Sequence, residues 1–296
     1  MIENLKGLYE TVMYQHDSPI RLYSNEEYEN YPLHWHTPIE IIMPTSNHYT
    51  AIIGGEHIHL DVNDILFICP GVLHALEAPQ TGERIIFQAE MSMLRELPEI
   101  EFLLSLISPA YTISAKSSSV LHDEIRKLLL DITHEYHSNN MLSSTCIYSH
   151  LLEIFVLIAR NYTANLRHLD SNSQKQQEYI EKFISICNYI NNHCTEDLTL
   201  DMVANLSGFS KYHFSRLFKQ FTNITFYKYL NQKRIVHAEM LLADPSINVS
   251  EVALSCGFQS LSAFMRMFKL IKKCTPTQYR NMYLSVSTEH FNQTTT

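Results

Sequence analysis

The sequence has no apolar run long enough to span a membrane. Its longest largely apolar stretch, LLEIFVLIA at 151–159, is far shorter than the roughly 20 residues that a membrane helix needs. The first ten residues, MIENLKGLYE, also lack the basic start and the apolar stretch of a signal peptide. These absences predict a soluble cytoplasmic protein without a membrane partner. The length of 296 residues, 45% of them hydrophobic, allows two domains.

Closely spaced cysteine pairs are also missing. The six cysteines are scattered, and none forms the two-residue-spaced pair of a zinc ribbon or a redox motif. Cys187 and Cys194 would share one side of a helix but lie too far apart along its axis for a direct bridge. We expect most of the cysteines to be reduced residues of the core.

Positive charge is scarce overall but concentrated in one region. The formal net charge is −9, which by itself argues against a nucleic-acid partner. Residues 1–177 contain 10 Lys and Arg against 22 Asp and Glu, whereas residues 203–283 contain 11 against 3. This division predicts an acidic module joined to a basic module that can approach phosphates, although a solvated basic face without a partner would give the same pattern.

Short apolar segments separated by turn residues fill the region from Tyr31 to about Ala89. Such evenly spaced segments predict an all-β sandwich or a small barrel. After Met91 the pattern becomes helical, with apolar stripes over 120–136 and 141–162. These helices either pair with a second copy of the chain or cover the open side of the β module. The polar segment that follows predicts an interdomain linker.

A duplicated pattern decides the class of the C-terminal region. Val203-Ala204 and Gly208-Phe209 return as Val252-Ala253 and Gly257-Phe258, at an offset of 49 residues. Further along, six residues return at an offset of 50: Phe214, Arg216, Phe218, Lys219, Thr225 and Tyr229 return as Phe264, Arg266, Phe268, Lys269, Thr275 and Tyr279. The region therefore contains two copies of one structural unit.

Each copy has the sequence pattern of a helix-turn-helix. In the first copy Thr199 is a cap for a short helix over 200–206, and Gly208 can take the positive φ that ends it. In the second copy Asn248 and Glu251 have the spacing of a capping box. A longer helix follows each turn, and a periodic helix over 226–242 separates the two copies.

The outward side chains of the second helix in each copy suit the major groove of DNA. Long cationic and hydrogen-bonding side chains near the start of a helix reach base edges, and more distal lysines meet phosphates. Arg216 and Arg266 can bind guanine or anchor a phosphate, the alternative being a salt bridge within the domain. The second copy is less polar, so we expect it to read fewer bases. The predicted DNA-binding residues are Ser210, Lys211, Tyr212, Ser215, Arg216, Lys219, Ser260, Leu261, Ser262, Met265, Arg266 and Lys269.

The stretch from about Tyr179 to Tyr283 resembles the DNA-binding domain of AraC/XylS-type transcription regulators. The resemblance is carried by GFQSLSAFMRMFKLIKKCTPTQYR, residues 257–280. Two features depart from the family pattern: Ala263 stands where an aromatic residue is common, and Lys273-Cys274 occupy the place of a usual glycine and its neighbour. The resemblance implies two helix-turn-helix units that bind double-stranded DNA, and activation of nearby genes through contact with RNA polymerase.

The stretch HWHTPIE, residues 34–40, raises the question of a second site. On one strand His34, His36 and Glu40 would face the same way, unless a bulge at Pro38 breaks the alternation. A hairpin could return His74, which follows a Pro-Gly turn, beside them. The pattern resembles the cupin fold, which AraC-type regulators commonly carry as an effector-binding domain; Asn47 and Asn63 fall where cupins often have glycine.

Three interpretations of this quartet remain open. The preferred one is an effector pocket for a hydroxyl-rich ligand such as a sugar, with Trp35 as a stacking platform beside His34, His36, Glu40 and His74. The second is a transition-metal site formed by the same histidines and glutamate, which would allow catalysis. In the third, the histidines are structural residues with satisfied hydrogen bonds.

We therefore predict a multidomain α+β protein that is a transcription regulator, without a catalytic step or a required cofactor. Its predicted partners are DNA, a small-molecule effector, RNA polymerase and a second copy in a homodimer. The alternative function is a metal-dependent cupin enzyme fused to a DNA-binding domain. The predicted parts are a cupin-like β-barrel over 1–100, a helical dimerisation segment over 101–166, a linker over 167–177, an all-α double helix-turn-helix over 178–283 and a tail over 284–296.

Overall fold

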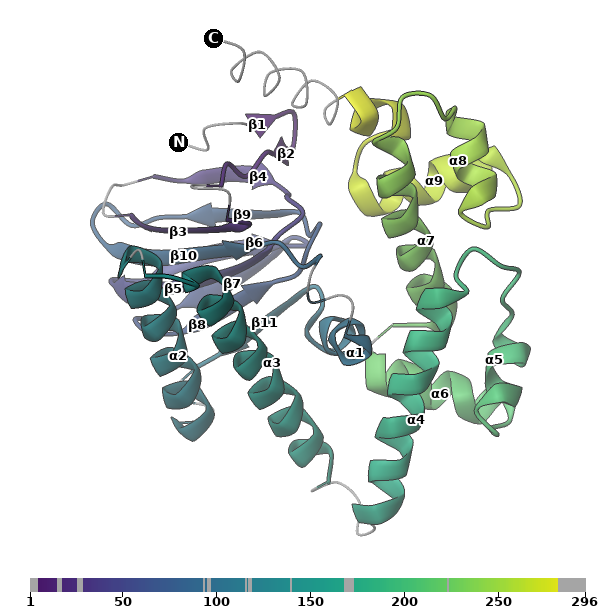
Figure 1. The fold of residues 1–296 in the computed structure, drawn as a ribbon, viewed down its shortest axis with the longest axis horizontal. Helices are drawn as coiled ribbons and strands as arrows, with labels where there is room; N and C mark the ends of the chain where they lie inside the picture. The colour runs from purple at the N-terminus through teal and green to yellow at the C-terminus, as the bar shows by residue number, and fades with distance from the viewer. Residues whose placement is uncertain are drawn as a thin grey trace. The chain divides into compact units, whose positions relative to one another are not determined.

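The computed structural model of the chain divides into two compact units. It describes residues 5–14, 18–25, 29–92, 94, 97–114, 116, 119–138, 140–167, 173–222 and 224–281. The first unit comprises residues 1–177 and contains all the described strands (Figure 1). The second comprises residues 178–296 and is helical where it has regular structure.

The described strands of the first unit form antiparallel sheets. A small ladder pairs β1 (Leu5–Lys6) with β2 (Tyr9–Glu10). The five-stranded sheet has the order β11 (Ala110–Ile113), β8 (Ile65–Ile68), β5 (Ile39–Ser46), β10 (Glu83–Ala89), β3 (Ile20–Asn25). The four-stranded sheet has the order β4 (Tyr31–His34), β9 (His74–Glu77), β6 (Tyr49–Ile53), β7 (Glu56–Leu60).

The two larger sheets pack against each other through a shared core. Ile42 and Ile86 of the five-stranded sheet belong to one buried cluster with Tyr49 and Leu76 of the four-stranded sheet. Because successive side chains in a strand point to opposite faces, alternate residues such as Phe87 face the other way. The sequence predicted either an all-β sandwich or a small barrel. The described strands form two packed sheets, which matches the sandwich. The cupin assignment stays a prediction.

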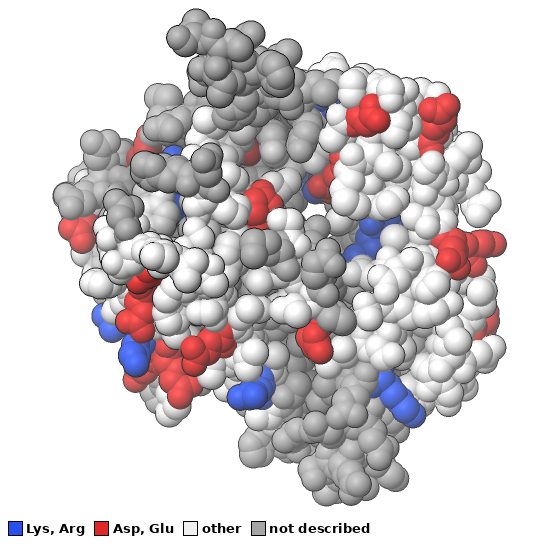
Figure 2. All heavy atoms as spheres, in the orientation of Figure 1, with Lys and Arg blue, Asp and Glu red and all other residues white. Residues whose placement is uncertain are grey.

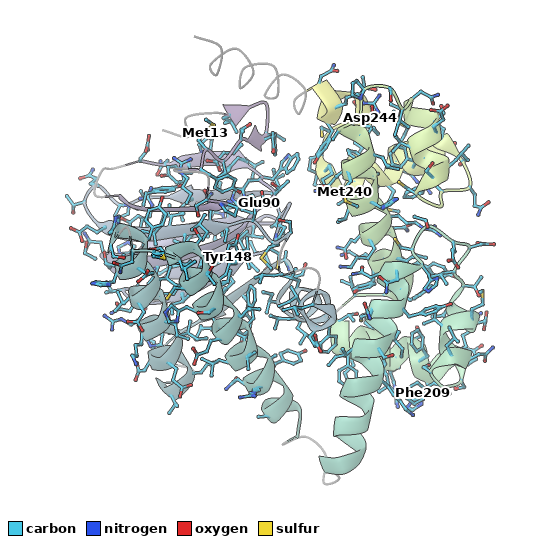
Figure 3. All side chains as sticks on the ribbon, viewed as in Figure 1. Met13, Glu90, Tyr148, Phe209, Met240 and Asp244 are labelled. Atoms are coloured by element: carbon cyan, nitrogen blue, oxygen red, sulfur yellow. The ribbon has the colours of Figure 1, made fainter. Side chains whose placement is uncertain are left out.

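Helices cover the outer face of the five-stranded sheet. They are α1 (Pro98–Ile107), α2 (Ser119–Ser138) and α3 (Ser143–Arg167) (Figure 1). The predicted apolar stripe is confirmed, since Leu121, Ile125 and Ile132 are buried in one cluster with Phe87. Tyr148 on α3 donates hydrogen bonds to the carbonyls of Glu90 (2.8 Å) and Pro19 (3.3 Å), which ties the helix to the sheet (Figure 3). The predicted pairing with a second copy stays a prediction.

The second unit contains α4 (Ser173–Asn192), α5 (Leu200–Leu206), α6 (Lys211–Thr222), α7 (Phe226–Leu242), α8 (Val249–Ser255) and α9 (Leu261–Lys272). Helix α4 begins inside the segment predicted as a linker, of which residues 168–172 lie outside the described part, as does the predicted tail. No described helix of either unit combines the length and the apolar character that a membrane crossing requires.

The predicted duplication is present in the packing as well as in the sequence. Phe218 meets Tyr229 edge-on with ring centroids 5.5 Å apart, and the second copy repeats this with Phe268 and Tyr279 at 5.4 Å. The predicted caps are also confirmed. The Thr199 side chain accepts from the amide of Met202, and Asn248 forms the reciprocal capping box of α8.

Three residues stand where the resemblances seen in the sequence would place glycine, and all three adopt a conformation that glycine favours. Asn47, Asn63 and Lys273 have φ values of 57°, 66° and 59°, in the left-handed region that glycine enters most easily. Asparagine tolerates this region better than most residues, whereas a lysine there is strained. The departures noted in the sequence therefore preserve the backbone path.

Candidate nucleic-acid interface and buried histidine site

The outward face of α6 carries most of the predicted DNA-binding residues of the first copy. Phe214 and Phe218 are fully buried, and this fixes which side of the amphipathic helix faces solvent. The predicted residues on the opposite side are all exposed: Lys211, Tyr212, Ser215, Arg216 and Lys219. Tyr212 is 87% exposed.

Helix α9 presents the equivalent face of the second copy. Phe264 and Phe268 are buried, while Ser260, Leu261, Ser262, Arg266 and Lys269 are exposed and Met265 is half-buried. Arg216 and Arg266 form no ion pair with any described residue. The alternative prediction for these arginines, a salt bridge within the domain, is therefore not seen among the described residues. Both guanidinium groups are therefore available to an anionic partner.

Some predicted contact residues already have partners within the unit. The Lys211 ammonium lies 2.6 Å from an Asp201 carboxylate oxygen, and this hydrogen bond raises the pKa of the lysine. The Ser260 hydroxyl caps α9 by accepting from the amide of Ala263. Ser210 accepts from the amide of His213 at 3.4 Å, a weak contact at the start of α6. These contacts help to position α6 and α9, in addition to any contact that the same residues make with DNA.

Two half-buried arginines connect the helix-turn-helix units, and the sequence did not indicate their contacts. On α7, Arg234 donates from Nε to the carbonyl of Cys194 (2.7 Å) and from Nη2 to that of Glu196 (2.8 Å). After α9, Arg280 donates to the carbonyls of Leu242 (3.1 Å) and Ile247 (2.6 Å). Each guanidinium joins the end of one helix to the segment beginning the next, and α7 is held at its middle by Arg234 and at its C-terminal end by Arg280.

The first unit brings the predicted histidine quartet together in its interior. His34, His36, Glu40 and His74 are each at most 3% exposed. The ring centroids of His34 and His74 lie 4.2 Å apart, and those of His36 and His74 lie 5.1 Å apart. The prediction of one continuous strand is wrong, because β4 ends at His34 and β5 begins at Ile39.

Backbone hydrogen bonds orient all three imidazoles in the same way. Each Nδ1 faces a carbonyl two residues away: His34 that of Pro32 (2.8 Å), His36 that of Pro38 (3.1 Å) and His74 that of Val72 (2.9 Å). A carbonyl can only accept, so each Nδ1 carries the proton. The Nε2 atoms therefore point away from these carbonyls, and the His74 Nε2 makes no close hydrogen bond among the described residues but lies 3.4 Å from Glu40 Oε1.

One ion pair and one neutral histidine follow from this arrangement. His36 Nε2 lies 3.1 Å from Glu40 Oε2. Burial opposes a charge on either group, but their attraction and hydrogen bond hold the pKa of His36 above and that of Glu40 well below the ordinary value. For His34, burial and the neighbouring His74 lower the pKa to about 3, which leaves the ring neutral.

Two further polar residues complete the site and were missed in the sequence. Gln88 on β10 donates a 2.7 Å hydrogen bond to Glu40, and Glu10 on β2 has a carboxylate oxygen 3.5 Å from His34 Nε2. Burial raises the pKa of Glu10, with His36 opposing that shift. Trp35, the predicted stacking platform, is 2% exposed and packs against Tyr9 with centroids 4.6 Å apart. Its role toward a ligand stays a prediction.

The donor set fits a transition-metal ion. His34, His36 and His74 each offer a ring nitrogen, and these atoms lie within 4.8 Å of one another. Imidazoles whose Nδ1 is held by a carbonyl are the usual ligands of zinc, iron and related ions, and Glu40 supplies an adjacent carboxylate. A bound cation would also give the His74 Nε2 a partner.

Comparison with known protein families gives a match to part of the second unit. A protein-family model described as a helix-turn-helix domain matches residues 203–282. Residues 203–282 form a helix-turn-helix domain. The matched range begins within α5 and extends past α9, so it contains both copies of the duplicated unit, as expected from the resemblance to AraC/XylS-type regulators.

Relatives extend beyond the helix-turn-helix domain. The chain is 26% identical over 289 residues to the HTH-type transcriptional regulator YdeC of Bacillus subtilis, covering 95% of this chain and 97% of that protein. It is 27% identical over 240 residues to an HTH-type transcriptional regulator of Staphylococcus aureus, covering 78% of this chain but only 30% of that longer protein.

Solved structures give weaker likenesses. ToxT from Vibrio cholerae is 12% identical, with a TM-score of 0.47 over 89% of this chain and 97% of that one. The DNA-binding domain of the transcriptional factor AdpA, in complex with a target DNA, is 27% identical with a TM-score of 0.33 over 34% of this chain and 91% of that one.

Proposed function

We propose that this protein is a sequence-specific DNA-binding transcription regulator of the AraC type, acting in the cytoplasm as a homodimer. The observation that carries the proposal is the duplicated helix-turn-helix domain, in which α6 and α9 turn an exposed arginine and lysine outward from matching places. The first unit is the sensor, and its interior histidine site binds a small polar effector. Output is activation of nearby genes through RNA polymerase.

Helix α6 makes most base contacts in this proposal, and α9 makes fewer. Arg216 and Arg266 contact guanine or phosphate, and Lys219 and Lys269 contact phosphates. With 17 residues, α7 is about 25 Å long, which keeps the two reading helices well apart. The first unit has far more acidic than basic residues, so repulsion keeps it away from the phosphates (Figure 2).

Effector binding shifts the equilibrium between different arrangements of the dimer. A ligand that fits the interior site better in one arrangement of the dimer favours that arrangement and alters how the dimer engages DNA. The buried polar groups of the site, with their fixed tautomers and the His36–Glu40 pair, supply donors and acceptors of defined direction.

The decisive experiment is a footprint of the purified full-length protein on the DNA flanking its own gene at moderate salt. A protected sequence spanning two adjacent major grooves on one side of the duplex is the expected result. Uniform protection without sequence preference would contradict the proposal. An Arg216→Ala variant footprinted in parallel is the control, because it removes one reading side chain and keeps the fold.

A metal-dependent role is the second candidate, favoured by the convergence of three imidazole nitrogens and a carboxylate. An ion held by His34, His36, His74 and Glu40 would act as a Lewis acid toward a bound substrate or would itself be the signal. Elemental analysis of the purified protein, with a His74→Ala control, tests this: a stoichiometric transition metal together with substrate turnover supports an enzyme. If the His74→Ala variant contains metal at the same metal-to-protein ratio as the wild type, the histidine site is not where the metal binds.

A further inference from the structure

Arg84 is a cation enclosed between the two packed sheets of the first unit. It lies on β10 of the five-stranded sheet and is 0% exposed. Its guanidinium carbon is 4.9 Å from the ring centroid of Tyr31 and 4.9 Å from that of Tyr49, and both tyrosines belong to the four-stranded sheet. The side chain therefore extends from one sheet toward the other.

The guanidinium has more donors than partners. Its Nη2 donates to the carbonyl of Glu29 at 3.2 Å, while Nε and Nη1 have no hydrogen-bond partner among the described residues. No described carboxylate pairs with it. The tyrosine rings stabilise the positive charge through their faces, but they cannot accept the N–H groups in the guanidinium plane. Burying a charged group with unmet donors costs free energy that a bound acceptor would offset.

Lys272, the other buried Lys or Arg among the described residues, is satisfied, and so are two half-buried arginines. Lys272, 6% exposed, places its ammonium 2.7 Å from a Glu239 carboxylate oxygen. Arg234 and Arg280 each donate to two backbone carbonyls. Arg84 is the exception among these residues, which suggests that its acceptor comes from outside the chain.

Strand register places Arg84 in the same interior as the histidine site but at its other end. Gln88, which bonds to Glu40, and Arg84 are four residues apart on β10, about 13 Å along the strand. Ile86 lies between them on the same face. The histidine end holds the carboxylates of Glu10 and Glu40, which repel an anion, so an anionic group of a ligand is directed toward Arg84.

We propose that Arg84 binds the oxyanion of the effector, so that the effector is an organic acid or a phosphate ester rather than a neutral sugar. This inference rests on the proposed function of the first unit as a sensor. The Nε and Nη1 groups, which have no partner among the described residues, donate hydrogen bonds to a carboxylate or phosphate oxygen, and Tyr31 and Tyr49 keep the guanidinium in place.

Small oxyanions test this without knowledge of the natural effector. The thermal unfolding midpoint of the full-length protein is measured without DNA in sodium acetate, sodium phosphate and sodium chloride at equal ionic strength. At several times the dissociation constant an anion bound to the folded state raises the midpoint by about 2 °C. We expect that rise over chloride in the wild type and its loss in Arg84→Met.

Each outcome decides one point. Arg126→Met, which removes a charge from α2, is the matched control and should keep the rise. A rise with acetate alone indicates a carboxylate ligand, a rise with phosphate alone indicates a phosphate ester, and a rise with both indicates an oxyanion site of either kind. No rise over chloride, or an equal rise in Arg84→Met, overturns the inference. Should Arg84→Met fail to fold, Arg84→Gln retains N–H donors without the charge and must also lose the rise.

Failure here is distinguishable from failure of the proposed function. If the wild type protects a specific DNA sequence but shows no oxyanion-dependent rise, the inference about Arg84 is wrong and the regulator assignment stands. If no sequence is protected, the regulator assignment is wrong whatever the anions do.

Discussion

His36 and Glu40 form a buried ion pair at the centre of the first unit. His36 Nε2 lies 3.1 Å from Glu40 Oε2, while His36 Nδ1 faces the carbonyl of Pro38. Because both neighbours are acceptors, the imidazole carries both protons and is positively charged. Gln88 supplies the second donor to the carboxylate. The pair thus fixes the protonation state of the site before any ligand enters.

Breaking this pair from one side should be costly. His36→Ala leaves the Glu40 carboxylate buried, with Gln88 at 2.7 Å and the more distant His74 Nε2 at 3.4 Å as its remaining contacts. We expect a loss of about 3 to 5 kcal/mol in the free energy of unfolding of the first unit. Denaturant titration measures it. The double variant His36→Leu/Glu40→Met removes both charges and should recover most of the loss. A double variant as unstable as the single one would show that packing, not charge, sets the cost.

Acid should destabilise the first unit through His34. Its folded pKa is about 3, against 6.5 for an ordinary histidine, so below pH 6.5 the unfolded chain takes a proton that the folded chain refuses. The free energy of unfolding therefore falls with decreasing pH, by up to about 1.4 kcal/mol per pH unit. Denaturant titrations between pH 4.5 and 6.5, in the presence of a chelator, measure the slope.

A variant isolates the contribution of His34. Glu10, whose pKa is raised by burial, acts in the opposite direction, so the informative quantity is the difference between the wild type and His34→Gln. The variant should be the less acid-sensitive of the two, and the exposed His57→Gln on β7 is the matched control. Parallel pH curves for wild type and His34→Gln would rule out the neutral buried state.

The two equivalent glycines of the duplicated turn should respond differently to alanine. Gly208 and Gly257 have φ values of 72° and 79°, so either alanine is strained, by about 1 to 2 kcal/mol. A Cβ at Gly208 meets nothing within 4 Å, whereas at Gly257 it would lie 2.5 Å from the carbonyl oxygen of Thr195. Gly257→Ala should therefore cost about 2 kcal/mol more than Gly208→Ala. Thermal or denaturant unfolding of the two variants compares them, and equal losses would contradict the close approach.

Lys273→Gly should stabilise the second unit. Lys273 ends α9 with φ of 59°, a conformation that glycine adopts without strain. We expect a gain of about 1 kcal/mol in the free energy of unfolding, reduced by the greater freedom of glycine in the unfolded chain. Because the side chain is exposed, the variant should bind DNA like the wild type unless Lys273 itself contacts phosphate. A destabilised variant would mean that the lysine makes a compensating contact.

Two neighbouring cations on α6 should affect DNA binding in different ways. Arg216→Ala should weaken specific binding by about 1 to 3 kcal/mol and relax sequence preference, because a base contact is lost. Lys219→Ala should weaken binding to all sequences alike and lower the salt dependence by about one unit. Binding titrations at several salt concentrations, on specific and unrelated duplexes, separate the two. Identical profiles would assign both residues to phosphate contacts.

The sequence predicted the helical unit closely because its signals are local. The bounds of α5 and α7 agree with the predicted 200–206 and 226–242, since Thr199, Asn248 and Gly208 mark helix ends through contacts within a few residues. Because the pattern repeats at an offset of about 50 residues, each helix-end signal also occurs a second time in the sequence.

The polar interior of the first unit was only partly predictable. His34, His36, Glu40 and His74 sit in two short motifs, whereas Gln88 and Glu10 reach the site through strand pairing across long stretches of chain. Sequence periodicity does not fix which strands become neighbours. A usable signal for Arg84 and Gln88 was present: both are polar and lie four residues apart, on either side of three apolar residues of β10. Helix α1 and strand β11 had no such signal and were not predicted.

The contacts of Arg234 have a consequence for the DNA sites that this protein can use. Because this guanidinium joins α7 to the segment after α4, close to the Gly257 turn, a change in the spacing of the two reading helices would break these hydrogen bonds. One base pair inserted between the two recognised segments rotates one of them by roughly a tenth of a turn about the duplex axis. Under the proposed function, its DNA sites should therefore tolerate base substitutions more readily than a change in the spacing between the two recognised segments.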